Sequence, residues 1–331
     1  MDKKYLPSVV ILYLNYFIHG IGCSLLSQQV VKEMLAAQWG VGDVMTVTAV
    51  AAALGLGRLV SLPFAGPLSD KLGRRISVLI GAASYVIFFI GIAFSQNIQV
   101  AYVAAVLGGI AIGILGVLAI FAPMPAGNAA AKSESFISSL KNANFSVESI
   151  ALILIGFTST ATFQLWLNCA QTFGKEIAGI PSESVSMMQT YYSAGTMVAL
   201  VVTSLLITKF KQVRFLVIYP AISVVMLVLV YLVKTPMICF VGAFVIGYAA
   251  AGGVLQMATA TVNDLFPNIK GTITSLVMIA SSLCNYTILS AAAKMSSMQV
   301  IMMNIVITVI GVLLAVFVNV RYGSLLAKTE Q

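Results

Sequence analysis

Two polar residues share one helical face near the start of the chain, inside a long apolar stretch. Asn15 and His19 are four residues apart, so a helix places both on the same side. An imidazole titrates at about pH 6.5, which suits a proton carrier. A neutral histidine bonded to a neighbouring helix or carbonyl is the alternative interpretation. Because a polar group is costly in hydrocarbon, this face is expected to point into the protein or into a water-filled cavity.

A second polar face lies near the middle of the chain. Thr160, Gln164 and Asn168 follow one another at intervals of four residues and therefore share one side of a helix. Two interpretations fit this face: one wall of a solute site, or hydrogen bonds between packed helices. Further candidates for the same pathway are Gln189, Tyr192, Gln256 and Asn285.

Arg58 is a charged residue inside an apolar stretch, eight residues before Gly66. Eight helical residues span about 12 Å, so a long side chain at this depth can snorkel to the cytoplasmic surface. Snorkelling is the interpretation we favour for Arg58, and binding of an anionic solute group is the alternative. Asp43 and Glu148 lie only at the edges of such stretches, so a carboxylate proton relay is not expected.

The elements that position these side chains are expected to be transmembrane helices. The 331 residues are 60% hydrophobic and 8% charged, whereas soluble domains are about 25% charged. Apolar runs long enough to cross a bilayer recur along the chain, and the short alternating segments of a β-barrel are missing. Ten spans are predicted: 6–29, 44–66, 76–95, 98–121, 149–170, 185–208, 213–233, 237–260, 272–293 and 298–320.

The positive charges are distributed unevenly around these spans. Most of the 18 Lys and Arg residues fall in segments that are cytoplasmic if the N-terminus is inside. The positive-inside rule therefore predicts a multi-pass protein of the plasma membrane with both termini in the cytoplasm. The net charge of +8 is a topology signal rather than a nucleic-acid patch, because the basic residues are scattered between spans.

The longest polar stretch, residues 123–148, is the predicted cytoplasmic linker. It separates an N-terminal half, residues 1–122 with four spans, from a C-terminal half, residues 149–331 with six. Transporters built from internal repeats have matching halves. The N-terminal half is thus predicted to lack about two helices.

A charged signature lies between the second and third spans, Gly66-Pro67-Leu68-Ser69-Asp70-Lys71-Leu72-Gly73-Arg74-Arg75. At every defining position it resembles the loop signature of the major facilitator superfamily. The resemblance implies a conformational latch that braces one half against the other in the outward-open state and releases it during alternating access. Ordinary positive-inside anchoring is the alternative interpretation. The latch residues would be Gly66, Asp70, Lys71, Gly73, Arg74 and Arg75.

The family's pattern of twelve helices is broken after residues 102–109. We place a join near Ala111 and Ile112, which would fuse the start of the fourth helix to the end of the sixth. Antiport is not predicted, because the fourth-helix arginine motif and the fifth-helix glycine-proline motif of drug/proton antiporters are missing. Gly108 and Gly109 in the fused helix predict close packing against a neighbour.

The predicted fold class is all-α, a polytopic membrane protein with about ten transmembrane helices. The predicted function is secondary transport of a small solute by alternating access, with protons as the candidate coupling ion. A transport-inactive deletion form that acts as a binding or scaffold protein is the alternative. The chain has no GxxxxGK[ST], HExxH or GxSxG motif, so an ATP-driven pump, an enzyme, a cofactor and a metal site are not expected. The expected partners are the solute and the lipid bilayer, without nucleic acid.

Overall fold

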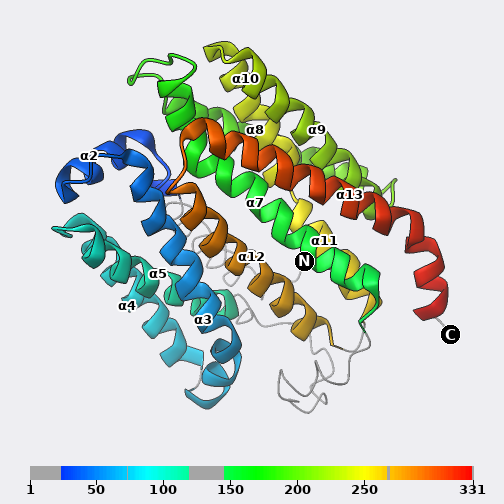
Figure 1. Cartoon of the computed structure of the whole chain (residues 1–331). Coiled ribbons are helices and arrows are strands. Elements are labelled where there is room, and N and C mark those ends of the chain that lie inside the picture. The colour runs from blue at the N-terminus through cyan, green and yellow to red at the C-terminus, as the bar shows by residue number, and fades with distance from the viewer. Residues whose placement is uncertain (1–23, 73, 119–144, 267–268, 330–331) are drawn as a thin grey trace.

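The computed structural model describes residues 24–72, 74–118, 145–266 and 269–329, and these are built of helices (Figure 1). In chain order they are α2 (Gln29–Trp39), the 3-10 helix η2 (Val44–Val47), α3 (Thr48–Leu72), α4 (Arg74–Ala93), α5 (Ile98–Leu118), α7 (Val147–Glu176), α8 (Met187–Leu206), α9 (Gln212–Val233), α10 (Pro236–Ile246), the π-helix η4 (Gly247–Ala251), α11 (Val254–Leu265), α12 (Lys270–Ala292) and α13 (Ser297–Thr329).

Nine of the ten predicted spans coincide with helices, and the first lies almost entirely outside the described residues. Six stretches of the described chain are long and apolar enough to cross a membrane. They are Val44–Pro63, Val147–Glu176, Gln212–Val233, Pro236–Leu265, Thr272–Ala292 and Ser297–Tyr322. The prediction of a helical membrane protein is therefore confirmed.

Residues 30–43, expected as a loop, instead form most of α2 and the approach to η2. Helix α2 ends at Gly40, whose φ of 66° is the left-handed conformation that glycine adopts readily. Asp43 then caps η2 by accepting a hydrogen bond from the Met45 backbone N–H at 2.8 Å. Eleven residues are too few to cross a bilayer, so α2 packs across the end of the bundle. We call this end the α2 end.

Two further boundaries differ from the prediction. Helix α3 continues to Leu72 and α4 begins at Arg74, so the described residues of the charged signature lie at helix ends rather than in an extended loop. The predicted span 237–260 is interrupted by η4 and by Gly253, which has a φ of 117°. Glycine tolerates this backbone conformation because it has no Cβ.

The described helices form two groups that meet along α3 and α12 (Figure 1). Helices α3, α4 and α5 pack together, and α7 to α13 form the larger group. A hydrophobic core at the α2 end includes residues from both groups, with Leu165 and Cys169 of α7 packed among N-terminal residues such as Leu26 and Val47. The two groups are thus continuous with each other at this end.

The predicted close packing of α5 is confirmed. A Cβ at Gly57 of α3 would overlap the backbone of Val106, and a Cβ at Gly109 of α5 would overlap the backbone of Leu54. Gly108 lies against Phe88 of α4, with a gap of 2.7 Å between the would-be Cβ and the ring. Helix α5 also continues without interruption through the site of the proposed join.

Candidate functional site: a cavity between the two halves

A cavity of about 350 Å³ lies between α3 and the helices α7, α8, η4, α11 and α12 of the C-terminal half. Its size falls in the range of sites for small molecules. Six of the nine predicted pathway residues line it: Arg58, Gln164, Asn168, Tyr192, Gln256 and Asn285. Five of these positions agree with the expectation that a polar side chain inside a span faces an interior cavity, and their role in a solute pathway stays a prediction.

The other predicted residues lie elsewhere. Asn15, His19 and Gly73 fall outside the described residues, and Gln189 is half-buried near the start of α8 without lining the cavity. Of the predicted latch residues, Gly66, Asp70 and Lys71 belong to the C-terminal part of α3, while Arg74 and Arg75 begin α4.

The polar face of α7 has two parts, one that contacts another helix and one that lines the cavity. Thr160 donates a hydrogen bond to Ser281 of α12 at 3.0 Å, so this position joins two helices. Asn168 lines the cavity, and its Nδ2 donates to the backbone oxygen of Gln164 at 3.0 Å and to its Oε1 at 3.1 Å. Because both partners are acceptors, the amide orientation of Asn168 is determined by these bonds.

Two amide oxygens of the cavity lining are buried without a partner among the described residues. They are Oδ1 of Asn168 on α7 and Oδ1 of Asn285 on α12. A buried acceptor without a donor costs about 1–3 kcal/mol. Both atoms are therefore suited to accept hydrogen bonds from a bound solute.

Arg58, for which we favoured snorkelling toward the cytoplasmic surface, contacts α12 in the structure. It lines the cavity, and its Nη2 lies 3.2 Å from Sδ of Met278 on α12. The close contact between α3 and α12, where Gly55 meets the backbone of Tyr286, positions this side chain between the halves. This position is compatible with the alternative interpretation, binding of an anionic solute group, which stays a prediction.

The α2 end of the cavity is closed by polar contacts between α2 and α7. The Gln29 backbone N–H donates to Gln171 Oε1 at 2.9 Å, and Thr172 donates to Gln29 Oε1 at 2.7 Å. Lys175 and Glu33 form an ion pair at 2.5 Å. Sequence reasoning missed this layer because it treated residues 30–43 as a loop.

Lys32 of α2 completes this closure. Its side chain is fully buried, and its Nζ donates to Thr48 Oγ1 at 3.2 Å and to the backbone oxygen of Asn168. Since Asn168 also lines the cavity, Lys32 lies directly behind the cavity wall. No sequence signal distinguished it, because a lysine just after a predicted span normally lies at the surface.

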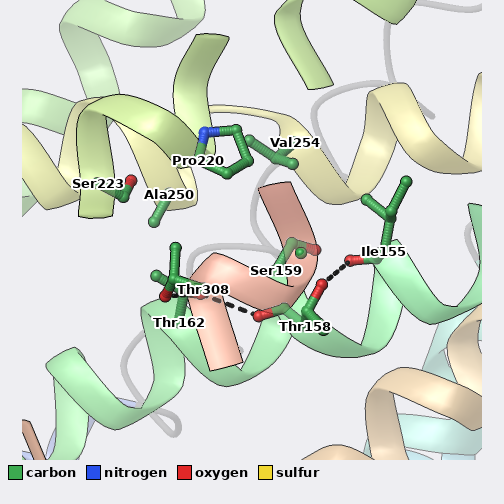
Figure 2. Close-up of a pocket in the computed structure, with 10 residues that line it drawn as sticks. Ile155, Thr158, Ser159, Thr162, Pro220, Ser223, Ala250, Val254 and Thr308 are labelled. Atoms are coloured by element: carbon green, nitrogen blue, oxygen red, sulfur yellow. Dashed lines mark hydrogen bonds between the residues drawn. The ribbon is translucent and has the colours of Figure 1, made fainter. Parts of the chain in front are cut away.

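A second, much smaller pocket lies inside the C-terminal half (Figure 2). Its volume of about 10 Å³ is near the minimum for one water molecule. Hydroxyl groups of α7, α9 and α13 line part of it, and Thr162 and Thr308 are hydrogen-bonded at 2.8 Å. This pocket is too small for a solute, and its hydroxyls join helices of one half. Within the described residues, no cluster of His, Cys, Asp and Glu could hold a metal.

Comparison with known proteins agrees with this architecture. Residues 10–142 match the family described as sugar (and other) transporters. The inner membrane transport protein YdiN of Escherichia coli strain K12 is 25% identical over 97% of this chain and 91% of its own. YdiM of the same organism is 28% identical over 97% of this chain and 96% of its own. The crystal structure of a D-xylose-proton symporter superposes with a TM-score of 0.71 at 14% identity, covering 95% of this chain and 97% of that one.

The alignment with YdiN also bears on the length of this chain. It spans 388 residues, which exceeds the 331 residues of this protein by 57. YdiN therefore has at least that many residues without a counterpart here.

Transport-protein relatives along nearly the whole chain, the matching fold and a polar cavity between two helical groups identify the protein as a membrane transporter of a small solute. Along nearly its whole length the chain is similar to transporters of the major facilitator type, among them an MFS-type transporter of Bacillus subtilis that is 26% identical over 95% of this chain.

Proposed function

We propose that this protein is a secondary active transporter that moves a small solute across the plasma membrane by alternating access. The observation that carries this proposal is the cavity between the two halves, lined by both and closed at the α2 end by contacts between them. The proposed orientation places both chain termini in the cytoplasm and the α2 end outside. This conformation is then closed to the outside.

The lining favours a neutral solute that donates hydrogen bonds. Asn168 of α7 and Asn285 of α12 offer unpaired acceptors, and the described lining contains no Asp or Glu that would pair with a cation. Its one charged side chain, Arg58, can donate hydrogen bonds to oxygen atoms of a neutral solute. Sugars, polyols and nucleosides meet these requirements, so they are the first solutes to test. Protons are the proposed coupling ion, since an imidazole such as that of His19 titrates at about pH 6.5 in water.

The test begins with a thermal-stability screen of the purified protein against these solutes. Any solute that raises the melting temperature is then assayed for uptake into proteoliposomes across an imposed pH gradient, with and without a protonophore. Proton-coupled transport predicts gradient-driven accumulation that the protonophore abolishes. Solute binding without flux would instead support the alternative function, a binding or scaffold protein that no longer transports.

Asn168→Leu tests whether the cavity is the solute site. Loss of one hydrogen bond is expected to weaken solute affinity about tenfold, corresponding to about 1.4 kcal/mol. Asn263→Leu is the matched control, because Asn263 also has a buried unpaired Oδ1 but does not line the cavity. Equal affinity losses in the two variants would contradict the assignment of this cavity.

A further inference from the structure

Lys32 is buried in a setting that is unusual for a lysine. Its side chain has 0% exposure, and both oxygens that accept its hydrogen bonds, from Thr48 and Asn168, are uncharged. In the described part of the chain, the carboxylates of Glu33 and Glu148 form ion pairs with Lys175 and Arg321, and none pairs with Lys32. Burying an ammonium group without a counter-charge is costly.

The position of Lys32 connects this cost to the conformation of the transporter. Lys32 belongs to the N-terminal half, whereas Asn168 lies on α7 of the C-terminal half. Separating α2 from α7 would break this bond and admit water to the ammonium group. The charge on Lys32 is thus disfavoured only while the α2 end is closed.

The groups that face Lys32 from neighbouring elements do not offset its burial. Cys169 of α7 is the titratable group whose charge interaction acts on Lys32. This interaction raises the pKa of Lys32, whereas burial lowers it. On α2 itself, Glu33 is engaged by Gln29 and Lys175, and before η2 the carboxylate of Asp43 accepts from a backbone N–H. Burial is the largest influence and lowers the pKa of Lys32 from its usual value.

We propose that Lys32 is a proton-binding residue of the outer gate, by which we mean the contacts between α2 and α7 at the α2 end. Lys32 is neutral while this gate is closed and protonated when it opens. This inference rests on the proposed alternating access and names a group that links it to protons. The chemical step is balanced: the ammonium releases one proton to water on closing, and the amine binds one from water on opening. No other reactant is required.

The direction of the pH dependence follows from this assignment. In the open gate, Lys32 would titrate near the usual value of about 10.4. Above that pH both states are neutral and closure carries no proton cost. As pH falls below it toward the lowered pKa of the closed state, closure requires release of a proton and becomes less favourable. The ratio of open to closed protein should therefore rise by up to tenfold for each unit of decreasing pH in this window.

The test measures the gate directly and needs no solute. Met34 of α2 and Met237 of α10 are 67% and 75% exposed on the two halves at this end, so spin labels there report gate opening. The four cysteines are first replaced by alanine, which also removes the influence of Cys169. Double electron–electron resonance in lipid nanodiscs from pH 5 to 10 should show a longer distance gaining population as pH falls.

Three substitutions separate titration from structure. Lys32→Met should abolish the pH dependence and leave the gate closed, and Lys32→Gln provides the same test if the methionine variant aggregates. Lys32→Arg should hold the gate open at every pH, because a guanidinium stays charged. Lys175→Met is the matched control, since it removes a cation from the same gate, and the Lys175 side chain is 32% exposed rather than buried. This variant should shift the populations of the open and closed gate without changing their pH dependence.

Two results would overturn the proposal. One is a distance distribution of the unsubstituted protein that does not change with pH, and the other is an unchanged pH dependence in the neutral Lys32 variants. Because the gate is observed without solute, failure of every uptake assay would leave these results interpretable. Conversely, proton-coupled uptake by a protein whose gate does not respond to pH would contradict this inference while supporting the proposed function.

Discussion

The ion pair between Glu33 and Lys175 holds α2 against α7 by a different kind of interaction from that of Lys32. Both side chains are about one-third exposed, at 34% and 32%, so solvent screens the pair. Burial raises the pKa of Glu33, but the bonds from Lys175 and Gln29 outweigh it and hold the pKa below its usual range. The stabilisation is therefore present above the usual value of about 4.3 and is lost as pH falls through the lowered value.

Glu33→Gln is accordingly expected to shift the gate toward the open state at pH 7 while preserving its pH dependence between pH 6 and 9. The carboxylate is fully ionised throughout that interval, so only its attraction for Lys175 is lost. The spin-label distances across the α2 end provide the measurement. A variant that loses the pH dependence in this interval would show that Glu33, rather than Lys32, is the titrating group.

The polar face of α7 allows a second prediction at this scale. Thr160→Val removes the hydrogen bond to Ser281 and should lower the free energy of unfolding by about 0.6–1.7 kcal/mol, as for other bonds between membrane helices. Solute affinity should stay unchanged, since Thr160 does not line the cavity. Thermal denaturation and solute binding measure the two effects. A loss of affinity without a loss of stability would assign Thr160 to the solute site instead.

The residues of the cavity were predictable to different degrees. Asn168 and Asn285 could be found because an amide in an apolar span must face the interior, and helical spacing then gives its direction. Lys32 could not be found, because a lysine after a span normally lies at the surface. Its burial depends on contact with α7, more than 130 residues away in the chain. Arg58 was located in the correct span, but its direction depends on the tertiary contact with α12.

At the scale of helices, the second and fourth spans of each half meet through glycines. Gly57 and Gly109 bring the backbones of α3 and α5 together, and Gly195 and Gly247 do so for α8 and the α10–η4 segment. The same helix pair is joined in the same way in both halves. This agreement supports an internal repeat, and it assigns the start of α5 to the fourth helix of the family.

Gly109→Val should therefore strongly destabilise the N-terminal half. The added side chain would meet the backbone of Leu54, which cannot move aside without separating α3 from α5. Overpacking of this kind costs about 1–3 kcal/mol or more. The melting temperature and the monodisperse fraction in detergent provide the measurement. Gly42→Val is the matched control, because a Cβ at Gly42 would meet nothing within 4 Å; equal losses in both variants would contradict this account of the packing.

The positions of most helices were predictable from hydropathy alone, since long apolar runs have few alternatives in a membrane. Helix α2 was missed because it is short and mixes charged with apolar residues, as a surface loop does. The interruption at η4 was missed for the opposite reason. Residues 245–255 contain no charged residue that would mark a boundary, and only the glycine pair allows the backbone to change direction.

The whole molecule combines an N-terminal half that is predicted to be short of helices with a cavity whose described lining comes from both halves. Among the described lining residues, those of the N-terminal half come from α3 and Ser24. None comes from α5, through which the proposed join passes. Loss of two helices near Ala111 and Ile112 would therefore leave this part of the solute site intact, and affect instead the surface that the half presents to lipid.

Restoring two helices between Ala111 and Ile112, copied from the corresponding region of YdiN, should consequently leave solute affinity within about threefold of the present chain, because the described cavity wall is unchanged. The rate of exchange between gate states is expected to change, since a complete half moves as a more rigid body. Solute binding and flux in proteoliposomes measure the two properties. An inserted pair of equal length and hydropathy but scrambled sequence is the control. Flux that appears only after restoration would show that the present chain is a transport-inactive deletion form that retains its solute site.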